Sequence, residues 1–295
     1  MKKFYKIGAF TIVIGIILAI IGFANHGFKT ISGNKFNNFH VVTQRPKPKK
    51  KVINVPKFKQ IDIDVDEADV YIHRGNKFQV TTTNYSDTPI TAKVSNQKQL
   101  SISGKESSYW INFGNSNHNS RIEITLPKKA ALTKITSKND EGDLILEHLT
   151  MDQLDLDIDE GDISLNNVTI NKKGNFNSSE GNFTIDSSRL TNSDFDSDEG
   201  DIDIKNSKIQ TISTTQDEGD LTFRNCSLSG HNSATLSEGD FRLNPLPKNT
   251  SFNLRTDDDT IIFGNRHVSS HFVKNVNNSK NKLTVTSDDG EIIIR

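Results

Sequence analysis

Paired acidic residues followed by glycine recur through the middle of this sequence. In the stretch NDEGDLILEH, Asp140 and Glu141 precede Gly142, and Asp143 follows it. Carboxylates this close together could hold Ca²⁺, which takes about six to eight oxygen ligands in loose geometry. They could also form an acid–base pair for catalysis, or accept hydrogen bonds in a tight turn. The DEGD motif or a looser copy begins at Asp66, Asp140, Asp159, Ser179, Asp198, Asp217 and Ser237.

The glycine of this motif recurs at a nearly constant interval. The successive spacings are 19, 20, 19, 19 and 20 residues. Self-similarity at such a period is typical of proteins that stack one repeat on the next, so the repeat must be interpreted before any single copy. The glycines that we expect at structural corners are Gly142, Gly161, Gly181, Gly200, Gly219 and Gly239.

Apolar residues alternate with polar ones on both sides of each glycine, but in opposite parity. In one repeat Leu154, Leu156 and Ile158 are even-numbered, whereas Ile163 and Leu165 are odd-numbered. An uninterrupted strand keeps its parity because its side chains alternate with period two. The parity change therefore predicts a turn or a bulge at the glycine, between two strands that share one core.

The same parity change recurs from about residue 66 to residue 294, with Ala68 and Asp259 in place of glycine in two copies. One such unit cannot close a core, but a stack of units can. We therefore predict an all-β fold, a single-chain β-solenoid (β-helix) with coils of about 19–20 residues. Residues 58–138 would form its N-terminal β-rich section, and residues 139–295 the regular repeats and closing strands. The strand pair at 282–294 would close the stack after an irregular loop at 264–281.

The N-terminal residues predict a membrane segment. Lys2, Lys3 and Lys6 precede an uncharged run of 18 residues from Ile7 to Ala24. As a helix this run would measure about 27 Å, close to the thickness of a bilayer core. We expect residues 1–25 to be a transmembrane anchor, with a cleaved signal peptide as the alternative. The preceding lysines favour a cytoplasmic N-terminus and an exported C-terminal body.

Charge is distributed unevenly along the chain. Residues 1–60 contain twelve Lys/Arg and no Asp/Glu, whereas residues 139–260 contain nine Lys/Arg and 26 Asp/Glu, a net charge of −17 (9 − 26). Residues 26–57 are interpreted as a basic Pro/Lys tether, either a plain spacer or a cationic strip near lipid headgroups or anionic wall polymers. We expect no nucleic-acid partner. The single cysteine, Cys226, excludes an internal disulfide and a clustered Cys/His zinc site.

Stacking would turn the repeated carboxylates into columns. Neighbouring charges about 4.8 Å apart would repel by about 1 kcal/mol in water. The carboxylates could accept hydrogen bonds from backbone N–H groups, remain solvated or bind Ca²⁺, although the spacing matches neither an EF-hand nor the nonapeptide calcium repeat. The glutamate column would be Glu141, Glu160, Glu180, Glu199, Glu218 and Glu238. The Ca²⁺ candidates are Glu141, Asp143, Glu160, Asp162, Glu199, Asp201, Glu218 and Asp220.

The sequence does not favour catalysis. Acid–base chemistry needs two groups whose environments push their pKa values apart, and an equivalent repeated set on an open surface does the opposite. We predict no enzyme activity, no catalytic residue and no cofactor other than the Ca²⁺ considered above. The alternative is a carbohydrate-active β-helix, either a Ca²⁺-assisted polysaccharide lyase or a glycan-binding protein. The basic candidates for a lyase are Arg189, Lys205, Arg224 and Arg242, which do not fall at one position of the repeat.

The stretches FKQIDIDVDEADVYI, IEITLPKKAALTKITSKNDEGDLIL and LTVTSDDGEIIIR, with the serial EGD units between them, carry a family resemblance. Together they resemble the LiaG-like "putative adhesin" family of bacterial β-strand-repeat proteins, over about residues 58–295. The resemblance implies a surface-exposed, membrane-tethered β-solenoid without catalytic residues. The Lys-, Asn- and Ile-rich composition is typical of a low-GC Gram-positive bacterium. Together with the N-terminal apolar run, the resemblance predicts a single-pass membrane protein with an extracytoplasmic body. Its function would be adhesion, scaffolding or envelope sensing, with an envelope polymer or protein as partner.

Overall fold

The computed structural model describes Gly15 and residues 30–34, 38–42, 47–85, 89–105, 109–113, 120–257 and 259–295. Its contacts divide the chain into two units, residues 1–47 with 106–118, and residues 48–105 with 119–295. Apart from Gly15, the predicted anchor at 1–25 lies outside the described residues. Among the residues that are described, no helix has both the length and the apolar character needed to cross a bilayer.

The first unit contains a small antiparallel sheet. It consists of β1 (Thr30–Asn34), β2 (Asn38–Val42) and β8 (Tyr109–Phe113), in the order β2-β1-β8. β8 is the larger part of the aromatic stretch SYWINF at 108–113, and it pairs antiparallel with β1.

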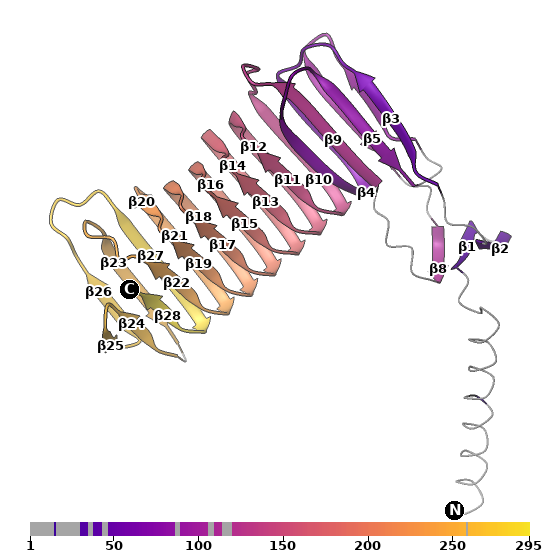
Figure 1. Ribbon diagram of the computed structural model, residues 1–295. Coiled ribbons are helices and arrows are strands. Elements are labelled where there is room, and N and C mark those ends of the chain that lie inside the picture. The colour runs from indigo at the N-terminus through magenta and orange to yellow at the C-terminus, as the bar shows by residue number, and fades with distance from the viewer. Residues whose placement is uncertain are drawn as a thin grey trace, which may run out of the picture. The chain divides into compact units, whose positions relative to one another are not determined.

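The second unit is built mainly from two parallel sheets, which run along its length (Figure 1). In each coil a long strand leads to the glycine corner and a short strand leaves it, which confirms the predicted all-β solenoid. The long-strand sheet includes β10 (Lys134–Glu141), β12 (Thr150–Glu160), β14 (Thr169–Glu180), β16 (Arg189–Glu199), β18 (Lys208–Glu218), β20 (Ser227–Ser229) and β21 (His231–Glu238). The short-strand sheet includes β11 (Leu144–Glu147), β13 (Ile163–Asn166), β15 (Phe183–Asp186), β17 (Ile202–Lys205), β19 (Leu221–Arg224) and β22 (Phe241–Asn244).

Burial follows the parity change predicted from the sequence. Leu154, Leu156 and Ile158 of β12 are buried, and after the corner Ile163 and Leu165 of β13 are buried. Side chains of both strands therefore point into one interior, and equivalent residues stack from coil to coil in a continuous apolar core. Burial of this apolar surface is the main source of stability in such a stack.

The middle coils balance large residues against small ones. The Phe176 and Phe195 rings stack with centroids 4.2 Å apart, and Phe183 meets Phe195 edge-on at 5.5 Å. The inward residues two positions further along, Ser178 and Ser197, are small and buried. This exchange of volume keeps the interior close-packed while the coil length stays almost constant.

The N-terminal end of the solenoid is more complex than the repeats. β4 (Gln60–Gly75) runs through a corner and pairs in parallel with β10 and β11. On its other side it pairs in parallel with β7 (Gln99–Gly104) and β9 (Ser120–Pro127). The antiparallel strands β5 (Gln79–Asn84), β6 (Thr91–Val94) and β3 (Lys49–Asn54) complete this end. β3 thus takes residues 49–54 of the predicted tether into the sheet.

The C-terminal end differs from the expected order. β27 (Lys282–Asp289) and β28 (Ile292–Ile294) do not lie outermost, but are inserted between β21–β22 and the coil formed by β23 (Ser251–Thr256) and β24 (Ile261–Phe263). The expected irregular loop at 264–281 contains β25 (Arg266–Val268) and β26 (His271–Lys274), which pair antiparallel with β24 and β23. These short strands cover edges that would otherwise be open to pairing with another chain.

Candidate functional site

The glycine corners are fixed by both conformation and space. The six predicted corner glycines have φ between 116° and 137°, a region that side chains rarely adopt. A Cβ atom added at Gly161 would lie 2.4 Å from the carbonyl oxygen of Gly142, and one at Gly181 would lie 2.2 Å from that of Gly161. Each corner therefore packs backbone against backbone, which only glycine permits. Ala68, which replaces glycine in the corner of β4, does not share this positive φ.

The aspartate after each glycine bonds to the neighbouring coil. The backbone N–H of Asp162 donates to Oδ1 of Asp143 at 3.0 Å, and that of Asp220 donates to Oδ1 of Asp201 at 2.9 Å. Asn182 accepts the same bond from Asp201 through its amide oxygen. These side chains thus supply acceptors for backbone donors that the corner leaves without a strand partner. The acceptors of this ladder are Asp69, Asp143, Asp162, Asn182, Asp201, Asp220 and Asp240.

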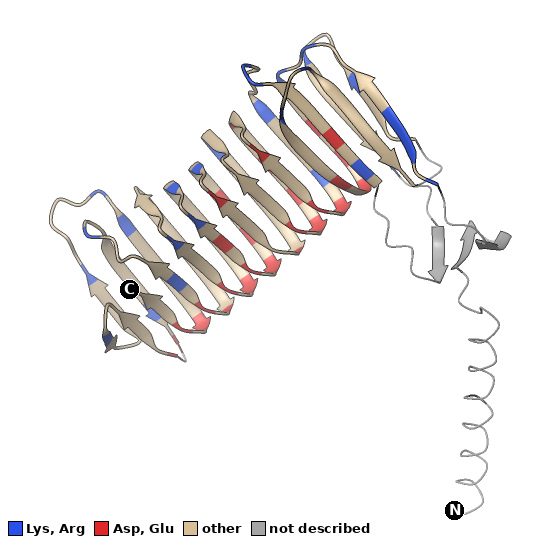
Figure 2. Cartoon of the chain, viewed as in Figure 1, with Lys and Arg blue, Asp and Glu red and all other residues tan. Residues whose placement is uncertain are grey.

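The glutamates of the corner form a separate, exposed column. Glu141, Glu160 and Glu180 are paired in register and lie at the solvent surface, as do their equivalents in the following coils. Figure 2 shows the acidic residues gathered along this edge of the solenoid. Among the described residues, no group of three or more His, Cys, Asp or Glu side chains could hold a metal ion. Ca²⁺ binding by the candidates named above stays one of the three alternatives for these carboxylates.

The basic lyase candidates do not converge on one site. Arg224 forms an ion pair with Asp203, and Arg242 forms ion pairs with Asp220 and Asp240. Lys205 lies 3.7 Å from Asp186. Arg189 begins β16 and is in register with Lys208 rather than with an acidic residue. Each of these three cations pairs with a carboxylate of its own coil or of the adjacent coil, so they hold neighbouring coils together.

A second corner, after each short strand, was not foreseen from the sequence. Its first residue has positive φ although it is not glycine, with values between 52° and 56°. Its second residue is buried, and its backbone N–H can donate to the side chain at the same place in the next coil. The Val168 N–H donates to Ser188 Oγ, and the Ser188 N–H donates to Ser207 Oγ, both at 3.0 Å. Asparagine enrichment at this place was the available signal, since asparagine tolerates positive φ. The positive-φ residues are His148, Asn167, Ser187, Asn206 and Asn225.

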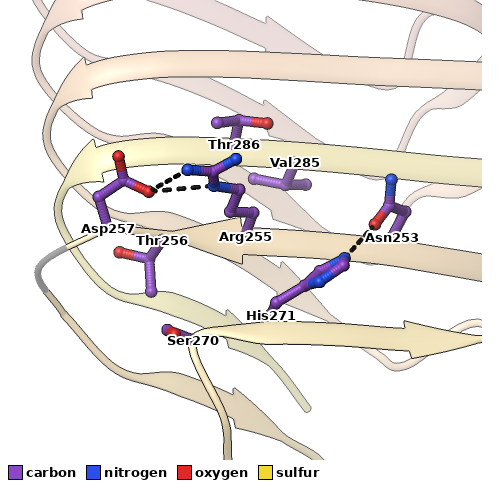
Figure 3. Close-up of a pocket in the computed structure, with 8 residues that line it drawn as sticks. All are labelled: Asn253, Arg255, Thr256, Asp257, Ser270, His271, Val285 and Thr286. Carbon is purple, nitrogen blue, oxygen red and sulfur yellow. Dashed lines mark hydrogen bonds and ion pairs between the residues drawn. The ribbon is translucent and has the colours of Figure 1, made fainter.

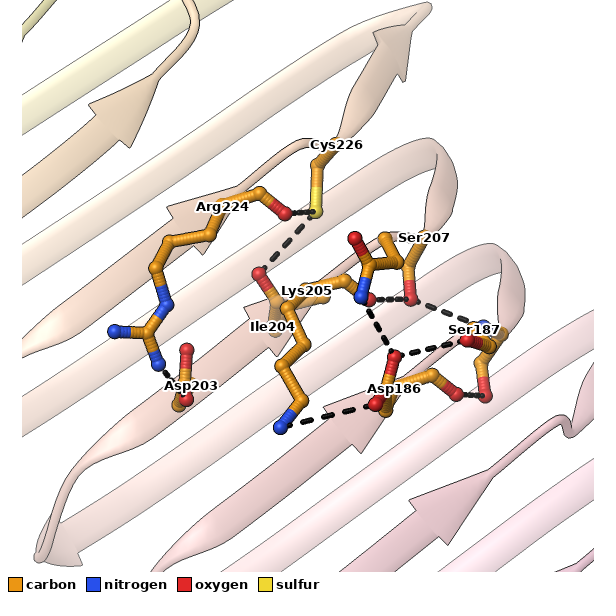
Figure 4. A network of polar contacts seen from close by, with 10 residues as sticks. Asp186, Ser187, Asp203, Ile204, Lys205, Ser207, Arg224 and Cys226 are labelled. Atoms are coloured by element: carbon orange, nitrogen blue, oxygen red, sulfur yellow. Dashed lines mark hydrogen bonds and ion pairs between the residues drawn. The ribbon is translucent and has the colours of Figure 1, made fainter.

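Cys226 occupies this inward position in its coil. Its thiol donates to the carbonyl oxygen of Ile204 at 3.2 Å, within the network drawn in Figure 4. Burial raises the pKa of the Cys226 thiol, which disfavours the reactive thiolate. Asp186 in the same network has a lowered pKa, chiefly because the Asn206 side chain donates a hydrogen bond to it. Cys226 is therefore a packing residue equivalent to Ser188 and Ser207.

A cluster of titratable side chains on β4, β9 and β11 was also missed, because it lies outside the repeated motif. The Tyr71 hydroxyl donates to Glu147, and the Tyr71 and His73 rings stack with centroids 4.4 Å apart. His73 Nε2 lies 2.9 Å from Glu123. Desolvation, and then the bond to Glu147, raise the pKa of Tyr71 to about 12. A phenol held protonated in this way is a hydrogen-bond donor, not a general base.

The described geometry is that of a repeat scaffold, and a sequence comparison identifies its family. Residues 58–295 match the Toastrack DUF4097 family. The chain belongs to this Toastrack family. The match confirms the predicted membership of an adhesin-like β-strand-repeat family of unknown function, while the relation to LiaG stays a prediction. No curated protein matches the chain.

Solved structures resemble this Toastrack chain in fold. A crystal structure of a "putative adhesin" from Bacteroides fragilis NCTC 9343 is 18% identical, covers 84% of this chain and 97% of its own, and has a TM-score of 0.50. A "putative lipid binding protein" from Parabacteroides distasonis ATCC 8503 is 13% identical, with coverages of 84% and 94% and a TM-score of 0.45. At these identities the likeness concerns the fold alone.

One hollow of about 450 Å³ lies near the C-terminal end of the Toastrack domain, on the outer side of the long-strand sheet. It forms where β26 turns back beside β23, next to β27 (Figure 3). We call it the C-terminal hollow. No residue in it was a candidate from the sequence, because the side chains of three separate strands combine to form it. Its lining residues are Asn253, Arg255, Thr256, Asp257, Ser270, His271, Val285 and Thr286.

Proposed function

We propose that this Toastrack protein is a non-enzymatic adhesion or scaffold module of the cell envelope. It would present a stiff β-solenoid outside the cytoplasmic membrane, anchored by residues 1–25, and contact an envelope polymer or protein. An envelope-sensing role would use the same exposed body. The name "putative adhesin" carried by the Bacteroides fragilis structure agrees with this proposal.

The observation that supports the proposal best is the use of the repeated carboxylates. The aspartates that could have formed a metal or catalytic site accept backbone N–H groups of the next coil. This ladder runs from Asp69, which accepts the Asp143 N–H, to Asp240, which accepts the Glu291 N–H. The repeated geometry of these corners therefore holds each coil on the next. A solenoid that exposes a similar surface on each coil favours contact with an extended partner over turnover of a substrate.

The membrane location is tested by protease treatment of intact cells. We expect residues 58–295 to be degraded by added protease while a cytoplasmic marker protein remains intact. If residues 58–295 are protected on intact cells and degraded only after lysis, the extracytoplasmic location is wrong. The same cells lysed before treatment serve as the control for protease sensitivity.

The non-enzymatic character is tested separately. The purified full-length protein, incubated with pectate and glycosaminoglycan panels with and without Ca²⁺, should release no unsaturated sugar products. Product formation that is lost in the Arg224→Ala variant would establish the lyase alternative instead. The Lys208→Ala variant, a change of a cation in the same coil, serves as the matched control.

A further inference from the structure

We propose that the solenoid associates side by side with further copies of this chain, with an acidic edge of one copy against a basic edge of the next. The inference goes beyond the proposed function and rests on it only for the shared membrane. Each short strand leads from a glycine corner to a second corner, and the long strand that follows returns to the next glycine corner. The two kinds of corner therefore lie on opposite edges of the solenoid.

Charges of opposite sign are separated between these two edges. The long strands from β10 to β21 that reach a glycine corner end there on a glutamate, and these glutamates are paired in register. We call their column, from Glu141 to Glu238, the acidic edge. Residues 139–240 contain six Lys and Arg, all between the last residue of a short strand and the fifth residue of the next long strand. These six, which we call the basic edge, are Lys172, Lys173, Arg189, Lys205, Lys208 and Arg224.

Neither edge is neutralised within its own copy. Three cations of the basic edge pair with aspartates. The other three cations, and all glutamates of the acidic edge, are exposed and form no ion pair with another described residue. The unpaired cations are Lys173, Arg189 and Lys208. Figure 2 shows Asp and Glu along the lower edge of the solenoid, and Lys and Arg of the middle coils away from it.

The strands themselves place the charges for a neighbour. β16 begins with Arg189 and ends with Glu199, and β18 begins with Lys208 and ends with Glu218. A copy moved sideways by one width of the solenoid, without rotation, has the start of each long strand beside the end of the same strand in the next copy. Opposite charges then face each other in successive coils, about 4.8 Å apart along the axis. The equal coil spacing of the two copies keeps these pairs in step.

Such an interface joins two different surfaces, so it is heterologous. Because no rotation relates the copies, the interface does not close, and copies extend in an open row. All copies in the row point the same way, as chains anchored in one membrane by the same segment would. The net charge of the whole chain is only −1, so copies are not held apart by net repulsion. Single exposed ion pairs are weak and screened by salt, but a membrane would raise the local concentration of copies.

Zero-length cross-linking with a carbodiimide tests the proposal on the purified full-length protein, concentrated in detergent micelles. The reagent joins a lysine amine to a carboxylate only where the two touch. Within one copy Lys208 and Glu218 lie at the two ends of β18, at least about 20 Å apart, so a cross-link between them joins two copies. We expect this cross-link at about 20 mM NaCl and its loss at about 500 mM NaCl. Because the purified protein is used, the result does not depend on the protein's location or adhesion partner in the cell.

Two charge-reversed variants test the complementarity of the edges. Neither variant alone should form cross-linked oligomers, because its two edges carry the same sign. An equimolar mixture of both should form them again, because each reversed edge then meets a reversed partner. The acid-reversed variant carries Glu180→Lys, Glu199→Lys and Glu218→Lys. The base-reversed variant carries Lys173→Glu, Arg189→Glu and Lys208→Glu.

The matched control reverses three exposed aspartates in the middle of the long strands, away from both edges. Its substitutions are Asp157→Lys, Asp194→Lys and Asp196→Lys. This control has the net charge of the acid-reversed variant and should form oligomers like the wild type. All three variants should keep the wild-type circular dichroism spectrum, since every substituted side chain is exposed. Absence of the Lys208–Glu218 cross-link in the wild type, loss of oligomers in the control, or no recovery in the mixture would each overturn the proposal.

Discussion

Replacing Gly200 by alanine should destabilise the solenoid through both conformation and packing. Gly200 has a φ of 120°, and an added Cβ would lie 2.2 Å from the Gly181 carbonyl oxygen. A side chain in this backbone region costs about 1–3 kcal/mol. Forcing a methyl group into a packed site costs about 1–3 kcal/mol more. We therefore expect the free energy of unfolding to fall by about 2–6 kcal/mol, a large part of the stability of an ordinary domain.

The matched control is Gly264→Ala, which separates the two effects. Gly264 has a φ of 63°, and an added Cβ would meet no atom within 4 Å. Only the conformational cost applies there, about 1–2 kcal/mol. Urea denaturation followed by far-UV circular dichroism compares the midpoints of both variants with the wild type. If Gly200→Ala is no more destabilising than Gly264→Ala, the close approach of stacked corners does not explain the repeated glycine.

Three further outcomes are expected. Asp201→Asn should change the free energy of unfolding by no more than about 0.5 kcal/mol, because Asn182 already fills the same role in its own coil. Asp201→Ala removes the acceptor of the Asp220 N–H and should lower the free energy of unfolding by about 1 kcal/mol. Urea denaturation measures both. Millimolar Ca²⁺ should not shift the melting temperature relative to equal Mg²⁺, since one oxygen of each ladder aspartate already accepts a backbone donor; a Ca²⁺-specific rise would contradict this. Because the folded-state pKa of Tyr71 is raised to about 12, its contribution to stability should be complete below about pH 10 and be lost as the pH rises towards 12. A tyrosinate absorbance titration should accordingly lose its latest phase in Tyr71→Phe.

The corner was predictable because a parity change is a local property of the chain. The buried residues on either side of Gly161 show it directly, without reference to any other coil. The second corner was not predicted, since its first residue varies from His148 to Ser187 and Asn225, and no single residue type marks it. Several residue types reach the same positive φ there because hydrogen bonds to the next coil, such as that accepted by Ser188, fix the turn.

The carboxylates show where sequence reasoning reaches its limit. Stacking into columns follows from the period alone, but the partner of each oxygen depends on the height and rotation of the next coil. Those quantities decide that Asp143 accepts the Asp162 N–H while Glu141 remains exposed. The C-terminal hollow lay further out of reach, because His271 meets Asn253 only through the antiparallel return of β26.

The insertion of β27 and β28 has a consequence for biosynthesis. Residues 282–294 leave the ribosome after residues 251–263, yet lie between that segment and the coil of β21 and β22. The coil of β23 and β24 therefore has no neighbour to dock on until translation has passed it by some thirty residues, on the order of a few seconds at ordinary elongation rates. Until then β21 and β22 end in an open edge, a site for premature pairing between nascent chains. Translation speed over this last stretch thereby bears on how much of the protein reaches its native stack.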